Sequence, residues 1–187
     1  MLTLLALALG FHAATPVRAA SGGGIIWVQT INPSAVDDDP FGLAIDSSGI
    51  YLAGVANSGV GGEWRMEKRS LTDGSLIWSQ TSNPSATGDQ AQGIAVDGSG
   101  VYVVGFDHVL GNTQWRIEKR DLTTGALIGA FGTAGVVTEN PSVNRDVANG
   151  VAVYNTGIYV VGVDRIPSPT DSEWRIEKRN LADGSLI

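Results

Sequence analysis

The chain has 187 residues, of which 43% are hydrophobic, with a formal net charge of −7 and no cysteine. That length suits one domain or two. The acidic balance argues against a nucleic-acid-binding protein, which needs a basic surface to replace counterions. The absence of cysteine excludes disulfides and thiolate chemistry.

Residues 1–20 are an apolar run rich in Leu and Ala that ends in small residues at Ala20. Such a run is typical of a secretory signal peptide, is too short for a comfortable membrane span, and is followed by no second hydrophobic stretch. We therefore expect a signal peptide over 1–20, a flexible lead-in over 21–24, and a secreted protein that is extracellular or periplasmic. A start codon assigned too late and an uncleaved anchor are the alternatives, because a positive n-region is missing.

The rest of the chain is organised around two strings that each occur three times. A Trp-bearing heptapeptide begins at residues 63, 114 and 173, and a glycine-bounded string begins at residues 42, 93 and 150. The tryptophans of the heptapeptide stand at positions 64, 115 and 174, hence 51 and 59 residues apart. Repeats of this length are typical of solenoids, propellers and arrays.

Each unit has the pattern of four short strands joined by tight turns. The segments are rich in β-branched and aromatic residues and are bounded by Gly, Asp, Ser and Thr. In the first unit, strands are predicted at residues 42–46, 50–55, 64–69 and 76–80, and the later units repeat them at 101–106, 115–120, 158–163 and 174–179. No sustained helical spacing follows the N-terminal run, so we expect antiparallel four-stranded meanders.

A single meander cannot bury both of its faces, whereas stacked copies can, and the predicted fold class is therefore an all-β, propeller-type array. The predicted units are residues 25–76, 77–127 and 128–187, which gives about three blades of an incomplete ring. Residues 25–34 match residues 77–85 almost residue for residue, so the chain is expected to begin on the last strand of a blade. We expect either a truncated gene product or a dimer whose two halves close one six-bladed ring.

The repeated string Gly-[Ile/Val]-Ala-Val-Asp-x-x-Gly-x-Tyr-Val-Val-Gly, followed by a Trp-bearing strand, resembles the β-propeller repeats of secreted bacterial proteins. The stretch 131–138 is also similar to the opening of the delta-sixty type of propeller repeat. This resemblance covers residues 25–187 and implies a secreted or surface-displayed propeller, and it carries over no catalytic residue.

Residues 73–78 are similar to the docking turn of quinoprotein dehydrogenases, Gly-x-x-x-Trp. The second unit has Gly129 where that Trp should stand, and the third unit ends before reaching it. A quinone cofactor is therefore not expected.

The strongest polar signal is an Asn-Pro-Ser string followed by an Asp, which gives Asp38, Asp89 and Asp146. Strand alternation places these connections on one face, together with the loops between the second and third strands of each unit. Loops on a rigid scaffold often carry binding sites, and such carboxylates could hold Ca²⁺ or a cationic or hydroxyl-rich ligand. The alternative is that each Asp forms an Asx-turn by accepting neighbouring backbone N–H groups.

The heptapeptide also permits two interpretations. Its tryptophans could stack on sugar rings or pack between blades, and packing is favoured because they lie mid-strand. Its Arg and Glu residues could form an anion-binding stripe, but same-face ion pairs are favoured. His108 is expected to be a solvated loop residue, and no Ser/His/Asp arrangement is supported.

The leading functional hypothesis is a non-enzymatic secreted binding or scaffold module whose extracellular ligand is a glycan or a protein. The alternative is a carbohydrate-active or other hydrolytic propeller that uses carboxylates on the same face, because two carboxylates suffice for glycoside hydrolysis. No cofactor is expected apart from the Ca²⁺ considered above.

Overall fold

A computed structural model describes residues 24–57, 61–109, 111–166 and 170–187. The chain divides into two units, residues 1–31 and residues 32–187. The predicted signal peptide lies outside the described residues. Within the first unit, residues 24–31 form no strand, which differs from the prediction that the chain begins on an outer strand. The described ranges contain no helix that is long and apolar enough to cross a membrane.

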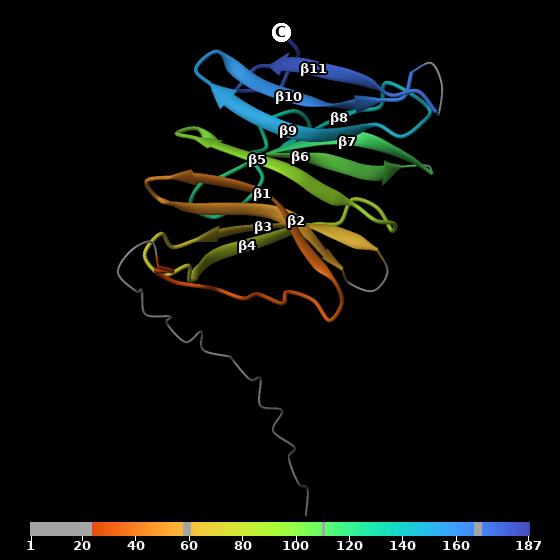
Figure 1. The fold of residues 1–187 in the computed structure, drawn as a ribbon. Coiled ribbons are helices and arrows are strands. Elements are labelled where there is room, and N and C mark those ends of the chain that lie inside the picture. Colours follow the sequence, from red (N-terminus) through yellow and green to blue (C-terminus); the bar gives the residue numbers. More distant parts are fainter. Residues whose placement is uncertain (1–23, 58–60, 110, 167–169) are drawn as a thin grey trace, which may run out of the picture. The chain divides into compact units, whose positions relative to one another are not determined.

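The second unit is built from antiparallel strands, and its described residues contain no helix (Figure 1). The strands are β1 (Asp38–Asp46), β2 (Gly49–Asn57), β3 (Gly62–Arg69), β4 (Leu76–Ser82), β5 (Gln90–Asp97), β6 (Gly100–Val109), β7 (Asn112–Arg120), β8 (Val136–Glu139), β9 (Val147–Tyr154), β10 (Gly157–Asp164) and β11 (Glu173–Arg179). The first sheet has the order β1-β2-β3-β4, the second β5-β6-β7-β8, and the third β9-β10-β11. The prediction of four-stranded antiparallel meanders is confirmed for the first two units, and the third has three strands among its described residues.

The turns between the first two strands of the first and second sheets follow from local side-chain chemistry. In the second sheet, the Asp97 carboxylate accepts hydrogen bonds from the Ser99 backbone N–H and hydroxyl, each at 2.8 Å. Asp46 and Ser48 make the same pair of bonds in the first sheet, at 2.7 and 2.8 Å. These Asx-turns bring the flanking strands into antiparallel register without a longer loop.

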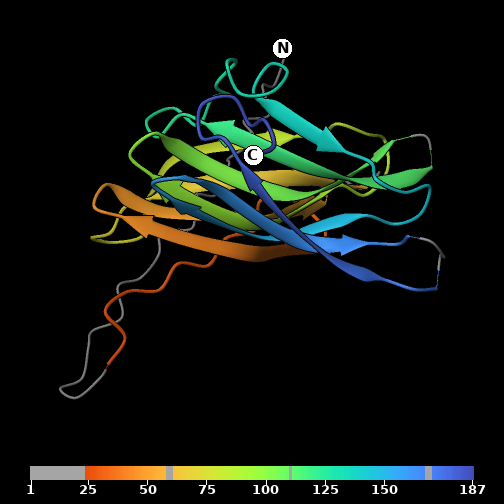
Figure 2. The ribbon, with the colours of Figure 1, turned by 90° about the horizontal axis from the view of Figure 1, so that it is seen from above.

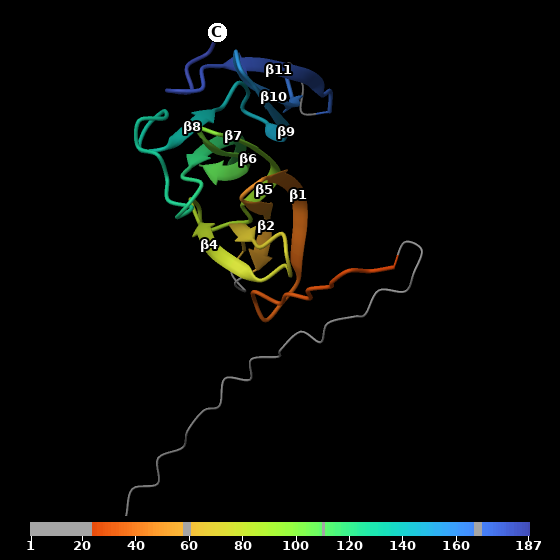
Figure 3. The ribbon, with the colours of Figure 1, turned by 90° about the vertical axis from the view of Figure 1, so that its left-hand side faces the viewer.

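The three sheets pack face to face in chain order. Figure 3 shows β1, β5 and β9 next to one another, with β4 and β8 on the opposite side of the sheets. Seen from above, most strands of the three sheets lie along similar axes, with neighbouring strands antiparallel (Figure 2). One buried apolar cluster joins the first sheet to β5 and β6, and a second cluster joins the second sheet to β9 and β10. The first and second sheets therefore each bury one face against the sheet that follows, and the second sheet is covered on both faces.

A tryptophan of the heptapeptide lies at the centre of each of these contacts, which we call seams. Trp64 is fully buried, and its indole Nε1 donates to the Phe106 carbonyl of the second sheet at 2.9 Å. Its ring lies against Gly105, where an added Cβ would be 2.9 Å from Trp64 Cζ2. The indole of Trp115 donates to the Val163 carbonyl at 3.2 Å. The packing role that the sequence favours for the tryptophans is therefore confirmed at these two positions.

The third tryptophan differs, because Trp174 is 90% exposed on the face of the third sheet that no other sheet covers. Its neighbour Ile176 is 70% exposed. The packing role predicted for all three tryptophans thus holds for two of them within this chain.

A substitution in the seam tests this packing. Gly105→Ala would place a methyl group against the Gln90 carbonyl and the Trp64 ring, so we expect the free energy of unfolding to fall by about 1–3 kcal/mol. The matched control is Gly98→Ala, whose Cβ would meet no atom within 4 Å and whose effect should stay within about 0.5 kcal/mol. Chemical denaturation of both variants measures the difference, and equal stabilities would contradict the seam geometry.

Candidate binding site

The Asp of the Asn-Pro-Ser string connects one sheet to the next. Asp89 is fully buried, and its carboxylate accepts hydrogen bonds from the Ser85 backbone N–H at 2.9 Å and the Ser85 hydroxyl at 2.7 Å. It also accepts the backbone N–H of His108 at the end of β6, at 3.0 Å. The Asp89 backbone N–H donates to the Gly62 carbonyl of β3. Asp89 thereby ties the start of β3 to the end of β6.

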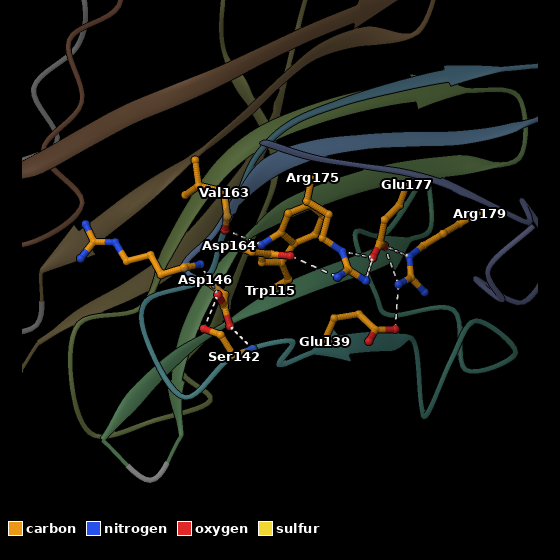
Figure 4. Close-up of polar contacts among 10 residues, drawn as sticks. Trp115, Glu139, Ser142, Asp146, Val163, Asp164, Arg175, Glu177 and Arg179 are labelled. Carbon is orange, nitrogen blue, oxygen red and sulfur yellow. Dashed lines mark hydrogen bonds and ion pairs between the residues drawn. The ribbon is translucent and has the colours of Figure 1, made fainter. Parts of the chain in front are cut away.

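Asp146 repeats this arrangement one sheet further on (Figure 4). Its buried carboxylate accepts the Ser142 backbone N–H at 3.0 Å, the Ser142 hydroxyl at 2.8 Å and the Arg165 backbone N–H at 3.2 Å. Its own backbone N–H donates to Thr113 of β7. In the first unit, Asp38 accepts the Ser34 backbone N–H at 3.1 Å. The turn-forming alternative considered from the sequence describes these contacts.

The prediction that the Asn-Pro-Ser connections share a face with the loops after the second strands agrees with the contacts of Asp89 with His108 and of Asp146 with Arg165. The described residues contain no group of three or more His, Asp or Glu side chains placed to hold a metal ion. Asp38, Asp89 and Asp146 are therefore not brought together, and each serves its own connection between strands.

An open hollow of about 560 Å³ lies at the loop end of the second sheet, between the connection that leads to Asp89 and the connection that leads to Asp146. Its lining includes an aromatic ring and polar side chains from several loops, among them Gln90, Phe106, His108, Asn112, Asn144 and Arg145. None of the lining residues is a carboxylate, because Asp89 and Asp146 lie buried behind the walls.

Neighbouring contacts orient the side chains of the hollow. The Asn112 amide donates to the Asn140 side-chain oxygen and to the Ser142 carbonyl, both at 2.9 Å. His108 is half-buried, its Nδ1 lies 2.9 Å from the Gly88 carbonyl, and its ring meets Phe106 edge to face. The prediction that His108 is a solvated loop residue is therefore wrong, because His108 lies in β6 and is half-buried against the Asp89 connection.

The base of the hollow is an aromatic ring with a cation beside it. The guanidinium of Arg145 lies 5.8 Å from the centre of the Phe106 ring, within the range of a cation–π contact. Arg145 is itself exposed, so the guanidinium is open to a ligand. Amide groups, an imidazole and a guanidinium on an aromatic floor offer hydrogen bonds to hydroxyl groups and charge to an anion.

The Arg and Glu residues of the heptapeptide form buried ion pairs on each third strand, as the sequence favours. Glu118 is fully buried and accepts the Nε–H groups of Arg116 and Arg120, each at 2.8 Å. Figure 4 shows the corresponding set in the third sheet, where Glu177 lies between Arg175 and Arg179. Because each guanidinium is engaged by this central carboxylate, the stripe is a structural element rather than an anion site.

Two further carboxylates stand at the ends of β6 and β10. Burial raises the pKa of Asp107 above its ordinary value of 3.8, and the nearby Asp89 raises it further, against the lowering effect of Gln114 and Arg116. Burial likewise raises the pKa of Asp164, despite its contact with Arg175 at 3.1 Å. Neither residue was singled out from the sequence, because the position is not an Asp in every unit: Ala56 occupies it in the first unit.

Neither the family models nor the curated proteins include a match to this chain.

The hollow itself was not foreseen from the sequence. His108, Asn112 and Thr113 fall in the predicted variable loop 107–113. Gln90 begins β5 and Asn144 lies in the connection before β9, so the convergence of these residues depends on the folded arrangement of the second sheet. The sequence features that could have indicated the hollow are the shared face of the loops and the position of Phe106 near the end of a strand.

Replacing the connecting carboxylate tests its role. We expect Asp89→Asn to lower the free energy of unfolding by about 1–3 kcal/mol, because one oxygen acceptor and the charge that strengthens these bonds are lost. Asp171→Asn, at an exposed position, is the control and should leave stability unchanged. Melting is then repeated with calcium. A calcium-dependent rise in Tm that disappears in Asp89→Asn would assign a metal role to this residue instead.

The raised pKa of Asp107 predicts a pH-dependent stability. In the folded chain this carboxyl keeps its proton to a higher pH than in the unfolded chain, so its contribution to stability declines as pH rises from 3.8 through the folded pKa. Asp107→Asn removes this titration, and the variant should therefore gain stability relative to the parent between pH 3.8 and neutrality. Denaturation across that range is the measurement, and a stability difference that is independent of pH would contradict the prediction.

Proposed function

We propose that the protein is a secreted, propeller-type binding module whose ligand lies in the hollow at the loop end of the second sheet. The repeated face-to-face packing of antiparallel sheets, with β1, β5 and β9 adjacent, supports a propeller architecture. The resemblance to repeats of secreted bacterial propellers and the apolar N-terminal run support export.

The lining of the hollow is the observation that carries the binding role. It combines Phe106 with side chains able to donate and accept hydrogen bonds, and it carries one exposed cation, Arg145. Hydroxyl groups of a sugar match the amides, and a carboxylate on the sugar matches the guanidinium that lies over the buried Phe106 ring. We therefore propose a glycan, with acidic sugars preferred, as the ligand.

The hydrolytic alternative needs two carboxylates that reach one substrate. Asp89, Asp107 and Asp146 are the carboxylates nearest the hollow in sequence, and each has an exposed fraction of 1% or less. The oxygens of Asp89 and Asp146 accept hydrogen bonds from backbone N–H groups and a serine hydroxyl, and Oδ2 of Asp107 accepts one from Arg116. The binding role is therefore the better supported of the two.

A glycan array tests the proposal. The parent protein should bind acidic glycans, and Arg145→Ala should bind them at least about tenfold more weakly, as expected for the loss of a charged hydrogen bond. Ile77→Ala, an exposed residue of β4 outside the hollow, is the matched control. A screen for released reducing ends is run on the same glycans. Turnover, or binding that Arg145→Ala leaves intact, would overturn the proposal.

A further inference from the structure

The two seams of this chain contain the same set of contacts, and this set can be compared with the residues on the outer faces of the first and third sheets. In each seam the heptapeptide tryptophan sits against a glycine of the next sheet and donates to the carbonyl of the residue after that glycine. Trp64 uses Gly105 and Phe106, and Trp115 uses Gly162 and Val163.

Cations complete each seam in the same way. Arg116 of the second sheet lies over the Trp64 ring at 5.7 Å, and Arg175 of the third sheet lies over the Trp115 ring at 5.6 Å. The heptapeptide lysine donates to a leucine carbonyl in the turn that follows the third strand of the next sheet. Lys68 makes this bond to Leu122 at 3.0 Å, and Lys119 makes it to Leu181 at 2.7 Å.

The third sheet carries the Trp and Lys side of a seam, but no described residue covers it. Trp174 is 90% exposed, Ile176 is 70% exposed, and Val161 beside them is 44% exposed. The matching residues of the first sheet, Trp64 and Met66, are fully buried. Neither Trp174 Nε1 nor Lys178 Nζ donates to an acceptor in the part of the chain that the structure describes.

The first sheet carries the opposite side of a seam, the side that β5 and β6 provide in the second sheet. Leu43 and Ile45 of β1 are 67% and 60% exposed. Their counterparts in β5, Ile94 and Val96, pack against the buried cluster of the first sheet. The first and third sheets thus carry the two complementary sides of one seam, and both sides are apolar and uncovered among the described residues of this chain.

We propose that a second copy of this chain covers these faces by head-to-tail association, with the third sheet of one copy on the first sheet of the other. In this contact Trp174 seats on Gly54 of the partner copy and donates to the Val55 carbonyl. Arg65 of the partner covers the indole ring, and Lys178 donates to the Leu71 carbonyl. Each of these positions corresponds, unit by unit, to a contact that both existing seams contain.

The same correspondence assigns a role to residues 27–31. They match residues 78–82 of β4, which pairs with β3 in the first sheet. The sheet order places β11 at an edge of the third sheet, where Leu186 and Ile187 already pair with the end of β11 in the way that Leu76 pairs with Arg69. In the head-to-tail pair, residues 27–31 of one copy continue this pairing along the rest of β11 of the other, in the antiparallel manner of β4 on β3.

Light scattering coupled to size exclusion tests the association over about a hundredfold range of protein concentration. The parent should rise from the mass of one mature chain to a multiple of that mass, whereas Trp174→Ala and Leu43→Asp should each keep the mass of one chain. Both residues are exposed, so circular dichroism melts of the two variants at the lowest concentration should match the parent. Val109→Ala, in the second sheet, is the control and should associate like the parent.

Mixing the two variants gives the decisive result. Each retains one intact face, Leu43 in Trp174→Ala and Trp174 in Leu43→Asp, so an equimolar mixture should form pairs with twice the mass of one chain. A contact between two like faces would give no rescue on mixing. A parent chain that is monomeric at every concentration, variants that associate normally, or a mixture that stays monomeric would each overturn the proposal. Because none of these residues lines the hollow, failure here leaves the glycan proposal separately testable.

Discussion

The structure depends on the need of each sheet to cover an apolar face. In β6, nine consecutive residues from Gly100 to His108 alternate between the two faces, yet only His108 among them is not buried. A sheet with solvent on one side would show alternating exposure, so β6 is a strand covered on both sides. The free energy gained by burying large side chains such as Trp64 and Trp115 is available only when another sheet approaches closely. Glycine at the facing position permits that approach, since a side chain there would occupy the space of the indole ring.

The ion pairs of the third strands place a second constraint on the stack. A buried carboxylate such as Glu118 is costly unless its oxygens are fully engaged, and removal of one partner leaves an uncompensated charge. The arrangement also reaches across seams, because Arg120 donates to the Ser82 hydroxyl of the first sheet and Arg179 pairs with Glu139 of the second, each at 2.7 Å. Apolar packing alone would tolerate sliding between faces, whereas these directional contacts specify one relative position of the sheets.

Much of the fold could be predicted from the sequence because its pattern is local and occurs three times. Strand alternation in the heptapeptide placed Trp64 and Arg65 on opposite faces, and the turns were marked by Asp, Ser and Gly. The function of Asp89 could be narrowed to two alternatives but not decided, since its partners at Gly62 and His108 come from different sheets. The hollow was beyond prediction for the same reason. Residues 25–31 match β4 in sequence but form no strand, so the sequence match alone did not predict their conformation.

The aromatic residues that contact Tyr51 and Tyr102 show how the repeat accommodates connections of unequal length between its third and fourth strands. In the first sheet, Trp78 of β4 contacts Tyr51 with ring centres 6.2 Å apart. The second unit has Gly129 where that tryptophan would stand, but Phe131 from the turn before β8 contacts Tyr102 at the same 6.2 Å.

Phe131 is fully buried, so a ring supplied from a different point of the backbone fills an equivalent space. The interior therefore constrains the position of the aromatic ring but not the number of residues in the connection that carries it. For protein engineering, this makes the connection between the third and fourth strands the place where residues can be inserted without rebuilding the core.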